Sequence, residues 1–472
     1  MTPPLSNTER RTDDRARTEQ VFHRNVERKT FEHTEPDSDS GVQLTREATV
    51  CVVGLGYVGL PLAVGFGEAA FDVIGFDVDD DKVETLQDGV DTTGDLSDKQ
   101  IAESGVTYTA DPTPIQDADY VFIAVPTPIN RDGHPDLDYV ESAAHTVGSN
   151  MAAGTTIVLE STVYPGATRD VLVPALEESS GFSAGEDFFV GYSPERATPG
   201  DEEHGLADVV KVVSGQNEAV LNDVAALYES IVDAGVHRAP SIEVAEASKV
   251  VENTQRDINI AFVNELTMAL EEMEVDTHAV LEAAGTKWNF HDYRPGLVGG
   301  HCIPVDPNFL AYQAERSGYT PELIQAGREV NESVPAHLAE ITIKALNRCH
   351  KTLCNSRVLV LGLAYKPNVD DIRSSKVSNV IAQLEDYDVD VEGYDPHADN
   401  EMAREAFGIE MQDQLSYEGF DAVMVATPHD EFAALDLESI AADLAEQPAL
   451  IDVTGAVDEA AAARAGFVYR RL

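Results

Sequence analysis

A cysteine that follows two glycines and precedes a proline has the surroundings that most favour chemistry in this chain. Cys302 stands in the segment GGHCIPVD (299–306). Glycines let a ligand approach the backbone closely, and a nearby cation or helix N-terminus could lower the pKa of the thiol enough to form a thiolate. The other cysteines, Cys51, Cys349 and Cys354, form neither a CxxC pair nor a zinc-site spacing, so we expect reduced thiols and no metal. Cys302 is therefore the candidate nucleophile.

Polar residues that repeat at helical spacing form a second candidate group. Lys249 and Asn253 are four positions apart and Arg256 follows three later, so all three project from one helix face. Lys and Asn side by side can donate hydrogen bonds to an oxygen on which negative charge develops. The alternative is an ordinary solvated face. Glu195, in YSPER (192–196), could activate a water, although as a lone carboxylate after a strand it is a weaker candidate.

A glycine pattern near the start of the chain predicts a dinucleotide site. An apolar strand runs into Gly54, Gly56 and Gly59 with GxGxxG spacing, and the next strand ends in Asp77. The glycines permit a tight turn and the approach of a pyrophosphate to a helix N-terminus, and the acid can accept both ribose hydroxyls. Because a carboxylate repels a 2'-phosphate, the pattern favours NAD over NADP. The alternative is that the glycines serve only helix packing.

The thiol and the dinucleotide site together indicate a two-step oxidation. Removing one hydride from an alcohol requires no nucleophile, but oxidising the resulting aldehyde does. A thiohemiacetal on Cys302 offers a carbon from which hydride can leave, and water can cleave the thioester that forms. The sequence therefore predicts NAD-dependent oxidation of a primary alcohol, through four electrons, to a carboxylate.

A second strand-and-turn unit near the C-terminus lacks the glycine set. Its turn reads GLAYKP (362–367), so a cation replaces the backbone cradle. Lys366 and Arg373 are the candidates for holding a different phosphate-bearing ligand, and the alternative for each is an ordinary surface cation.

Buried strands recur in two sets that would position these residues. Short apolar runs separated by helix-length segments indicate parallel sheets. The first set covers 48–56, 71–77, 118–126 and 154–162, and the second covers 356–364, 388–395, 420–427 and 448–454. The expected fold class is α/β, with two Rossmann-like doubly wound parallel-sheet domains joined by a long central helix.

The long helix is expected from Ser241, after Pro240, to about Met273. It would serve as spacer and dimer element. The expected division is a disordered polar extension over 1–46, an NAD-binding Rossmann domain over 47–216, a central helical dimerisation and catalytic segment over 217–333, and a Rossmann-like domain for the second ligand over 334–472.

The charge balance limits the partners that the chain can have. Its 472 residues include 32 basic and 85 acidic residues, a formal net charge of -53. Such self-repulsion opposes binding to nucleic acid or anionic lipid, and a high-salt cytoplasm would screen it, so we expect a halophile. No apolar run reaches the length of about 18 residues that spans a bilayer, and the N-terminus has no secretion signal. We expect a cytoplasmic protein without membrane insertion.

Several motifs, taken in order, resemble those of the UDP-sugar 6-dehydrogenase family. The resemblance covers about residues 47–472. The motifs are GLGYVGLP (54–61), VPTP (125–128), ESTVYPG (160–166), SPER (193–196), SKVVEN (248–253), GGHCIPVDP (299–307) and GLAYKPNVDDIR (362–373). It implies an NAD domain, a central dimer element and a C-terminal UDP domain, with NAD as cofactor, a UDP-sugar as substrate and a homodimer as assembly.

The resemblance also assigns roles to residues. Cys302 would be the nucleophile, Lys249 and Asn253 the oxyanion stabilisers, Asp306 and Thr162 the residues that position water and thiol, and Glu195 the residue for thioester hydrolysis. Expected at the cofactor are Gly54, Gly56, Tyr57, Val58, Gly59, Asp77, Lys82, Thr127, Thr162 and Arg373. Expected at the substrate are Arg196, Lys249, Asn253, Arg256, Tyr293, Arg294, Gly299, His301 and Lys366.

Three positions favour the branch of the family that acts on UDP-N-acetylhexosamines. These are His301 before the cysteine, Arg196 after the glutamate, and Val305 where the UDP-glucose branch has a lysine. The loop YRPGLV (293–298) departs from the family pattern, so UDP-GlcNAc, UDP-GalNAc and UDP-ManNAc all stay open. The alternatives are a UDP-glucose 6-dehydrogenase, a two-electron hydroxyacid-type dehydrogenase and a non-catalytic UDP-sugar sensor.

Overall fold

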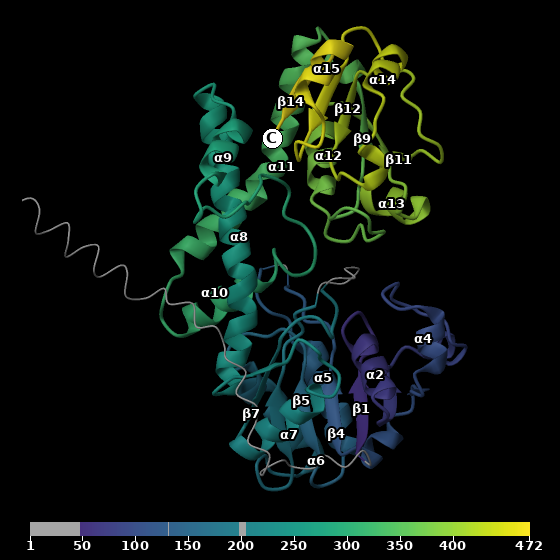
Figure 1. The fold of residues 1–472 in the computed structure, drawn as a ribbon, viewed down its shortest axis with the longest axis vertical. Coiled ribbons are helices and arrows are strands. Elements are labelled where there is room, and N and C mark those ends of the chain that lie inside the picture. Colours follow the sequence, from purple (N-terminus) through teal and green to yellow (C-terminus); the bar gives the residue numbers. More distant parts are fainter. Residues whose placement is uncertain (1–47, 131, 198–203) are drawn as a thin grey trace, which may run out of the picture. The chain divides into compact units, whose positions relative to one another are not determined.

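The computed structural model describes residues 48–130, 132–197 and 204–472. The extension expected over 1–46 lies outside the described residues. Two separate sheets and a set of long helices make up the described part of the chain (Figure 1).

The first sheet has eight strands in the order β3-β2-β1-β4-β5-β6-β7-β8. Their bounds are β1 Thr49–Val53, β2 Asp72–Phe76, β3 Thr107–Thr109, β4 Tyr120–Ile123, β5 Thr156–Leu159, β6 Phe189–Tyr192, β7 Lys211–Gly215 and β8 Val236–Arg238. All four strands expected in this half are present. Every neighbouring pair is parallel except β6 and β7, which are antiparallel, so the expectation of a purely parallel sheet is corrected at that pair.

Both faces of this sheet are covered. Alternate residues of β1 enter different cores: Cys51 and Val53 belong to one hydrophobic cluster, and Val50 and Val52 belong to another. Side chains alternate across a strand, so this division requires helices on both faces, as in a doubly wound domain. The helices are α2 Gly59–Glu68, α3 Asp80–Gln87, α4 Asp98–Glu103, α5 Asp138–Asn150, α6 Val173–Ser180 and α7 Glu218–Tyr228, with short turns η1 Thr113–Asp117 and η2 Thr168–Leu172.

The expected long helix is α8, Ile242–Glu272. It begins where the sequence predicts, because the Ser241 side chain accepts a hydrogen bond from the Val244 amide and caps the first turn. Helices α10 (Asp306–Arg316) and α11 (Glu322–Arg348) pack against α8, and α9 (Thr277–Gly285) follows it.

The second sheet has six parallel strands in the order β11-β10-β9-β12-β13-β14. Their bounds are β9 Arg357–Leu361, β10 Asp390–Tyr394, β11 Glu410–Met411, β12 Ala422–Val425, β13 Ala449–Asp452 and β14 Val468–Arg471. The helices are α12 Val377–Glu385, α13 Asn400–Phe407, α14 Leu437–Asp443 and α15 Glu459–Ala465, with η3 Leu353–Asn355 and η4 Asp430–Phe432. Alternate residues of β9 again enter two cores, so the second Rossmann-like domain is confirmed.

Three elements do not fit the domain limits expected from the sequence. Strand β8 belongs to the first sheet and helix α7 packs against its strand β7, although both lie beyond residue 216. Helix α11 continues through residue 333 and packs against α12 of the second domain. We propose that the first domain ends after β8 and that α11 is shared by the central and C-terminal parts. Among the described residues, no helix is long and apolar enough to cross a membrane, and no group of His, Cys, Asp or Glu could hold a metal ion.

Candidate active site

The glycine turn after β1 has the geometry that a dinucleotide site requires. Gly54 has a φ of +91°, and a Cβ there would lie 2.7 Å from the Ala124 carbonyl oxygen. A Cβ on Gly59 would collide with the Gly54 carbonyl oxygen, so this glycine allows α2 to pack against the turn. A Cβ on Gly56 would meet nothing within 4 Å. The first and third glycines thus shape the turn, and the second leaves open space where a pyrophosphate can approach.

Asp77 follows β2 and organises the same turn. Its Oδ2 accepts hydrogen bonds from the Leu55 amide at 2.8 Å and from Lys82 Nζ at 2.9 Å, and Oδ1 accepts from the Asp79 amide at 3.1 Å. Burial alone would raise the pKa of Asp77, but these hydrogen-bond donors have the larger effect. The pKa therefore lies below its ordinary value, and the group stays a carboxylate. Lys82, expected at the cofactor, is thus the charge partner of Asp77. The glycine turn and this carboxylate fit the phosphates and a ribose of NAD.

The two threonines expected beside the nicotinamide follow neighbouring strands. Thr127 comes after β4 and Thr162 after β5, and β4 and β5 are parallel partners. Their carboxyl ends therefore share one edge of the sheet. The Ser161 hydroxyl donates to the Val125 carbonyl oxygen at 2.6 Å and ties the two segments together. Both threonines are half-buried at this edge.

Cys302 lies in the turn that leads into α10. Its carbonyl oxygen accepts hydrogen bonds from the Val305 and Asp306 amides at 3.0 and 2.9 Å, and the residue is exposed. Although the residue is exposed at the surface, the surrounding protein partly desolvates the thiol, and this desolvation and the negative charge of Asp306 raise its pKa above the ordinary value. The positive charges of Lys249, Arg256 and Lys366 oppose that rise. The expectation of a lowered thiol pKa is therefore wrong for this structure, although the expected cations are the groups that act on the thiol.

The polar face of α8 meets the start of α10. Asn253 donates a hydrogen bond from Nδ2 to Asp306 Oδ2 at 2.5 Å, and both residues are buried. Burial raises the pKa of Asp306 to about 6, although the charge of Lys249 and the bond from Asn253 lower it. Asp306 can therefore exchange a proton near neutral pH. The structure thus brings Cys302, Asp306, Asn253 and Lys249 together.

The glycines before Cys302 admit a loop of the second Rossmann-like domain. A Cβ on Gly299 would lie 2.8 Å from the Ser374 carbonyl oxygen, and one on Gly300 would lie 2.8 Å from the Tyr365 ring. Gly300 also has a φ of +86°, which favours glycine. The sequence predicted a close approach at these glycines, and the structure shows that a protein loop makes it.

This loop, residues 365–376, also reaches the glycine turn of the first domain. Asp371 accepts from Arg373 Nε and Nη2 at 2.9 Å each and lies 3.4 Å from the Nε2 atom of His301. The Arg373 guanidinium lies 5.7 Å from the centre of the Tyr57 ring, and its Nη2 atom is 3.4 Å from the Tyr57 hydroxyl. Arg373 is therefore placed at the expected cofactor turn, and His301 beside the same loop. Val58, the N-cap of α2, completes that turn.

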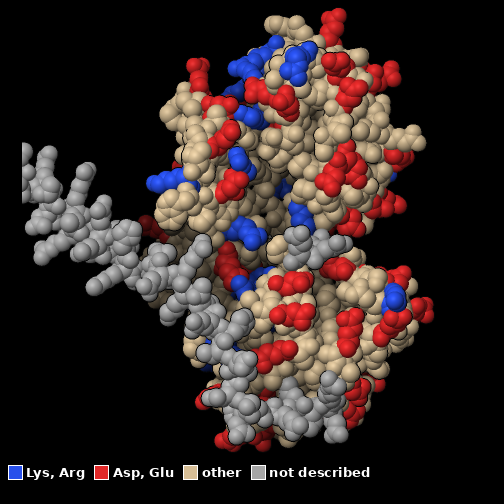
Figure 2. Space-filling model, viewed as in Figure 1, with Lys and Arg blue, Asp and Glu red and all other residues tan. Residues whose placement is uncertain are grey.

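A cleft of about 260 Å³ opens at the carboxyl ends of β9, β12 and β13. It lies where the strand order of the second sheet reverses, between β9 and β12, which is the usual ligand position in such sheets. The charged residues that line it are Arg294, Lys366 and Lys376, and Gly299 joins them. Figure 2 shows acidic side chains spread over this face of the molecule, whereas several of the fewer basic side chains lie around a hollow. Lys376 was not predicted from the sequence.

The second domain has a turn like that of the first domain, but the residues that would bind a dinucleotide differ. Gly362 has a φ of +81° and packs against Thr427 as Gly54 packs against Ala124. Ala364 stands two positions later, as Gly56 does, and lines the cleft. Asp395 after β10 accepts from the Leu363 and Ala364 amides and lies 3.1 Å from the buried His429 Nε2. This carboxylate is used within the protein, which agrees with the prediction of a different ligand.

The loop that departs from the family pattern is fixed to α8. The side-chain amide of Asn264 donates to the Gly296 carbonyl oxygen and its Oδ1 accepts from the Gly296 amide. Gln255 donates to the Tyr293 hydroxyl at 3.2 Å, and Arg294 pairs with Asp292. Tyr293 and Arg294 therefore lie on a held loop, and Arg294 faces the cleft.

Glu195 and Arg196 are engaged within the protein. Glu195 Oε2 lies 2.9 Å from Lys211 Nζ, and Arg196 forms an ion pair with Glu252 of α8 at 2.8 Å. Lys211 also pairs with Glu160 at 2.8 Å. Sequence reasoning missed Lys211 and the role of Glu160. A lysine at the start of an apolar strand, in a chain poor in basic residues, was the available signal.

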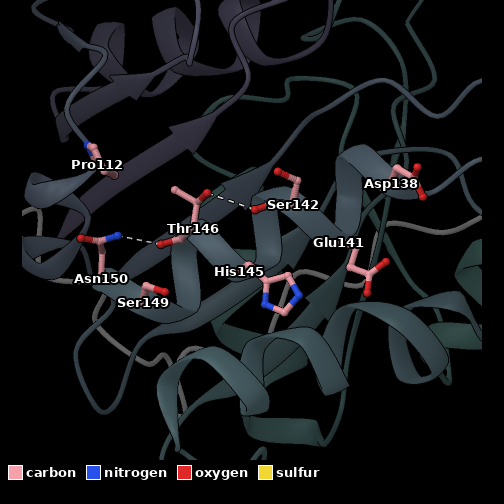
Figure 3. Close-up of a pocket in the computed structure, with 8 residues that line it drawn as sticks. All are labelled: Pro112, Asp138, Glu141, Ser142, His145, Thr146, Ser149 and Asn150. Atoms are coloured by element: carbon pink, nitrogen blue, oxygen red, sulfur yellow. Dashed lines mark hydrogen bonds between the residues drawn. The ribbon is translucent and has the colours of Figure 1, made fainter.

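A wider hollow of about 630 Å³ lies along α5, away from these groups (Figure 3). Its side chains come almost entirely from one helix, and two of them bond within it: Thr146 donates to the Ser142 carbonyl oxygen and Asn150 to the Thr146 carbonyl oxygen. None of the residues predicted for chemistry lines it. The cleft at β9 and β12 is therefore the better ligand site, although it is smaller.

Comparison with known proteins identifies the family. Models of the UDP-glucose/GDP-mannose dehydrogenase family match residues 48–232 as the NAD binding domain, 243–333 as the central domain and 359–459 as the UDP binding domain. The chain is 45% identical to Protein CapL of Staphylococcus aureus over 383 residues, which are 81% of this chain and 90% of CapL. It is 43% identical to the UDP-N-acetyl-D-glucosamine 6-dehydrogenase of Pseudomonas aeruginosa over 396 residues, which are 84% of this chain and 94% of that protein.

A solved structure shares the fold over nearly the whole chain. The UDP-D-ManNAc dehydrogenase from Pyrococcus horikoshii has a TM-score of 0.82 and 31% sequence identity, with 90% of this chain and 98% of that chain covered. These matches confirm the expected family, the enzyme class and the NAD cofactor. The chain therefore belongs to the UDP-glucose/GDP-mannose dehydrogenase family and is an NAD-dependent nucleotide-sugar dehydrogenase.

Proposed function

We propose that the protein oxidises the C6 alcohol of a UDP-N-acetylhexosamine to the uronate through a thioester on Cys302. The observation that carries the proposal is the position of this exposed thiol, beside the Asn253–Asp306 bond and within the field of Lys249. A dehydrogenase that stopped at the aldehyde would need no thiol there.

In the first half of the reaction the C6 alcohol loses a hydride and a proton and becomes an aldehyde. NAD, when bound, supplies the hydride acceptor. Lys249 and Asn253 stabilise the negative charge that develops on the C6 oxygen, because a cation and an amide donor cost no reorganisation once they are held on a rigid helix. Asp306, with a pKa of about 6, can hold or accept the proton that is released.

In the second half the Cys302 sulfur adds to the aldehyde carbon and forms a thiohemiacetal. A second hydride leaves this carbon for another molecule of NAD while the thiohemiacetal hydroxyl releases its proton, and a thioester results. Water then attacks the acyl carbon, the carbon–sulfur bond breaks, and Cys302 regains its thiol. Glu195 takes the proton from this water, and Thr162 and Asp306 position the water and the thiol.

The uridine diphosphate is held in the cleft of the second sheet. Lys366 and Lys376 place positive charge at its wall, and Arg294 adds a third cation from the loop before Cys302. In a chain with so few basic residues, three cations around one cleft favour a diphosphate ligand. Arg196, Arg256 and Tyr293 would contact the sugar side, where α8 and this loop meet.

Two positions in the sequence and one relative favour an N-acetylhexosamine over glucose. His301, which lies beside Asp371, stands where the UDP-glucose branch usually has Ser or Tyr, and Val305 stands where that branch has a lysine. The relative from Pseudomonas aeruginosa is named a UDP-N-acetyl-D-glucosamine 6-dehydrogenase. Because the 293–298 loop departs from the family pattern, the configuration of the sugar is left to experiment.

A substrate panel tests this proposal. The protein is incubated with NAD in high salt with UDP-GlcNAc, UDP-GalNAc, UDP-ManNAc or UDP-glucose, and NADH formation is followed. We expect an N-acetylhexosamine to give the highest kcat/KM. A higher value for UDP-glucose would overturn the substrate assignment, and no NADH with any of them would overturn the function.

We further propose a homodimer that forms through α8. Val244, Val251 and Phe262 are 46%, 48% and 54% exposed, and their spacing puts them in one stripe along the helix. The stripe is about 27 Å long at 1.5 Å per residue. A second copy of this chain is the proposed occupant, because the same stripe on two molecules gives a self-complementary interface.

The proposed chemistry needs a reduced thiol at Cys302, which favours the cytoplasm as the compartment of the protein.

A further inference from the structure

A lysine is buried between two glutamates at the carboxyl edge of the first sheet. Lys211, the first residue of β7, is 2% exposed, and its Nζ lies 2.8 Å from Glu160 Oε2 and 2.9 Å from Glu195 Oε2. The remaining side of the ammonium faces the Tyr228 ring, 5.1 Å from its centre. Buried lysines are rare unless they are paired, because removing an ammonium from water costs several kcal/mol. This cluster therefore calls for a function.

The antiparallel pair of the first sheet creates this cluster. Glu160 directly follows β5, and Glu195 follows β6, so both lie at the carboxyl edge of the sheet. Because β7 runs opposite to β6, its first residue reaches that same edge. The register pairs Gly191 with Gly215 and Tyr192 with Ser214, and continuing it sets Lys211 opposite Glu195. A parallel β7 would carry Lys211 to the other edge.

Glu195 is held in one orientation by donors on both of its oxygens. Its Oε1 accepts from the Arg196 and Ala197 amides at 2.8 and 2.5 Å, and its Oε2 accepts from Lys211. A carboxylate offers about four acceptor positions, so these three donors from the described residues leave one on Oε2. The Arg196 ion pair with Glu252 fixes the same segment to α8, one residue before Asn253.

The two glutamates differ in which of them can accept a proton. Burial alone would raise the pKa of Glu195, but the charge of Lys211 and the three hydrogen-bond donors together have the larger effect. The pKa of Glu195 therefore lies below its ordinary value, and this group stays ionised. Burial raises the pKa of Glu160 to about 7 against the opposing effect of Lys211. Glu160 is therefore the member of the cluster that carries a proton near neutral pH, and Glu195 stays available as a base.

We propose that Lys211 is a positioning residue for thioester hydrolysis, because it holds Glu195 as an oriented carboxylate whose free acceptor position receives the attacking water. The inference rests on the function proposed above. The water oxygen bonds to the acyl carbon, the carbon–sulfur bond breaks with the electrons going to sulfur, and the water proton passes to Glu195. Lys211 transfers no atom itself. Its loss should slow this step and leave both hydride transfers nearly intact.

The test separates hydrolysis from oxidation. In the double variant Lys211→Met with Glu160→Gln, the ammonium and the neighbouring carboxyl are removed together, so Glu195 loses its cation without being left beside a second ionisable carboxyl group. The variant is mixed with NAD and the UDP-sugar that the panel selects, quenched in acid, and examined by intact-mass spectrometry. We expect a burst of two NADH per site, an acyl adduct on Cys302, and steady-state turnover reduced by roughly 10²-fold.

Two further variants make the result decisive. Lys211→Gln removes the charge but keeps two N–H donors for the glutamates, so it should disturb folding less than the double variant. It should accumulate the same adduct. Lys351→Met, which removes a lysine from its pair with Asp421 far from the site in sequence, should not. Equal slowing of the burst and of turnover, or unchanged turnover, would overturn the role of Lys211. A wild-type enzyme that yields one NADH per substrate would instead overturn the proposed function.

Discussion

At the scale of single residues, the glycines of the first turn (Gly54, Gly56 and Gly59) and the glycines before Cys302 (Gly299 and Gly300) have different structural roles. Gly54 and Gly59 are required by the turn itself, and Gly56 leaves open space, which is how the spacing was interpreted. Gly299 and Gly300 were interpreted as room for a ligand, but the Ser374 carbonyl and the Tyr365 ring fill that room. Sequence shows that a side chain is excluded. It does not show what excludes it when the neighbour lies far away along the chain.

The thiol shows the same limit. The spacing on α8 predicts that Lys249 and Arg256 share one helix face, and both lower the pKa of the thiol, but Asp306 and the desolvation of Cys302 outweigh them and raise it. Those two effects depend on packing between α8, α10 and the 365–376 loop, which no local motif reports. Glu160 and Lys211, 51 positions apart, were missed for the same reason.

The raised pKa predicts the pH dependence of Cys302 alkylation. Iodoacetamide reacts with the thiolate, so the rate for Cys302 should keep rising with pH beyond the ordinary thiol value of 9.0. Asp306→Asn removes a negative charge and should move the midpoint to lower pH, and Lys249→Ala should move it higher. The rate is measured by mass spectrometry, with Cys302→Ala correcting for other thiols. A midpoint below pH 9.0 in the wild type, or shifts of opposite sign, would contradict this account.

At the scale of elements, long and capped segments were the easiest to predict. The start of α8 follows from Ser241 as N-cap, and the eight strands that the sequence predicts are all present. Strand β7 was not among the predicted strands, and its direction could not be predicted, because a short apolar run such as KVVSG does not indicate whether it pairs parallel or antiparallel. That direction decides where Lys211 lies. The antiparallel direction of β7 therefore places Lys211 beside Glu195, and the sequence alone does not reveal it.

The exposed stripe on α8 predicts a dimer that one substitution should weaken. Phe262→Glu puts a charge where the second copy would bury it, which should raise the dimer Kd by roughly 10²-fold or more. Light scattering coupled to size exclusion in high salt reports the mass. Met402→Glu, on α13, changes a side chain of similar exposure and should leave the mass unchanged. A wild-type protein that runs as a monomer would rule out the interface.

At the scale of the whole molecule, two Rossmann-like domains have diverged around one plan. Both have a glycine with positive φ after the first strand and a carboxylate after the second. In the first domain that turn leaves open space at Gly56, whereas in the second domain Ala364 stands at the matching position, His429 pairs with the carboxylate of Asp395, and cations line the cleft. The strand patterns predicted this duplication. The pairing of His429 with Asp395 could not be predicted, because the two residues follow different strands, β12 and β10.

The net charge of the molecule predicts a strong effect of salt on stability. With 85 acidic and 32 basic residues, self-repulsion should destabilise the fold at low ionic strength. The Debye length falls from about 10 Å at 0.1 M to about 3 Å at 1 M, so added KCl should screen it. We expect Tm to rise steadily from roughly 0.2 M to 2 M KCl in calorimetry. A Tm that is flat or falls over this range would contradict the expectation of a halophile.

The central claim is a four-electron oxidation through Cys302, and the ratio of NADH to carboxylate tests it most directly. The selected UDP-sugar is converted to completion in high salt, NADH is counted by absorbance, and the uronate is quantified by mass spectrometry. We predict two NADH for each uronate with the wild type and no uronate with Cys302→Ala. One NADH per substrate, or uronate formed at the normal rate without Cys302, would contradict the account.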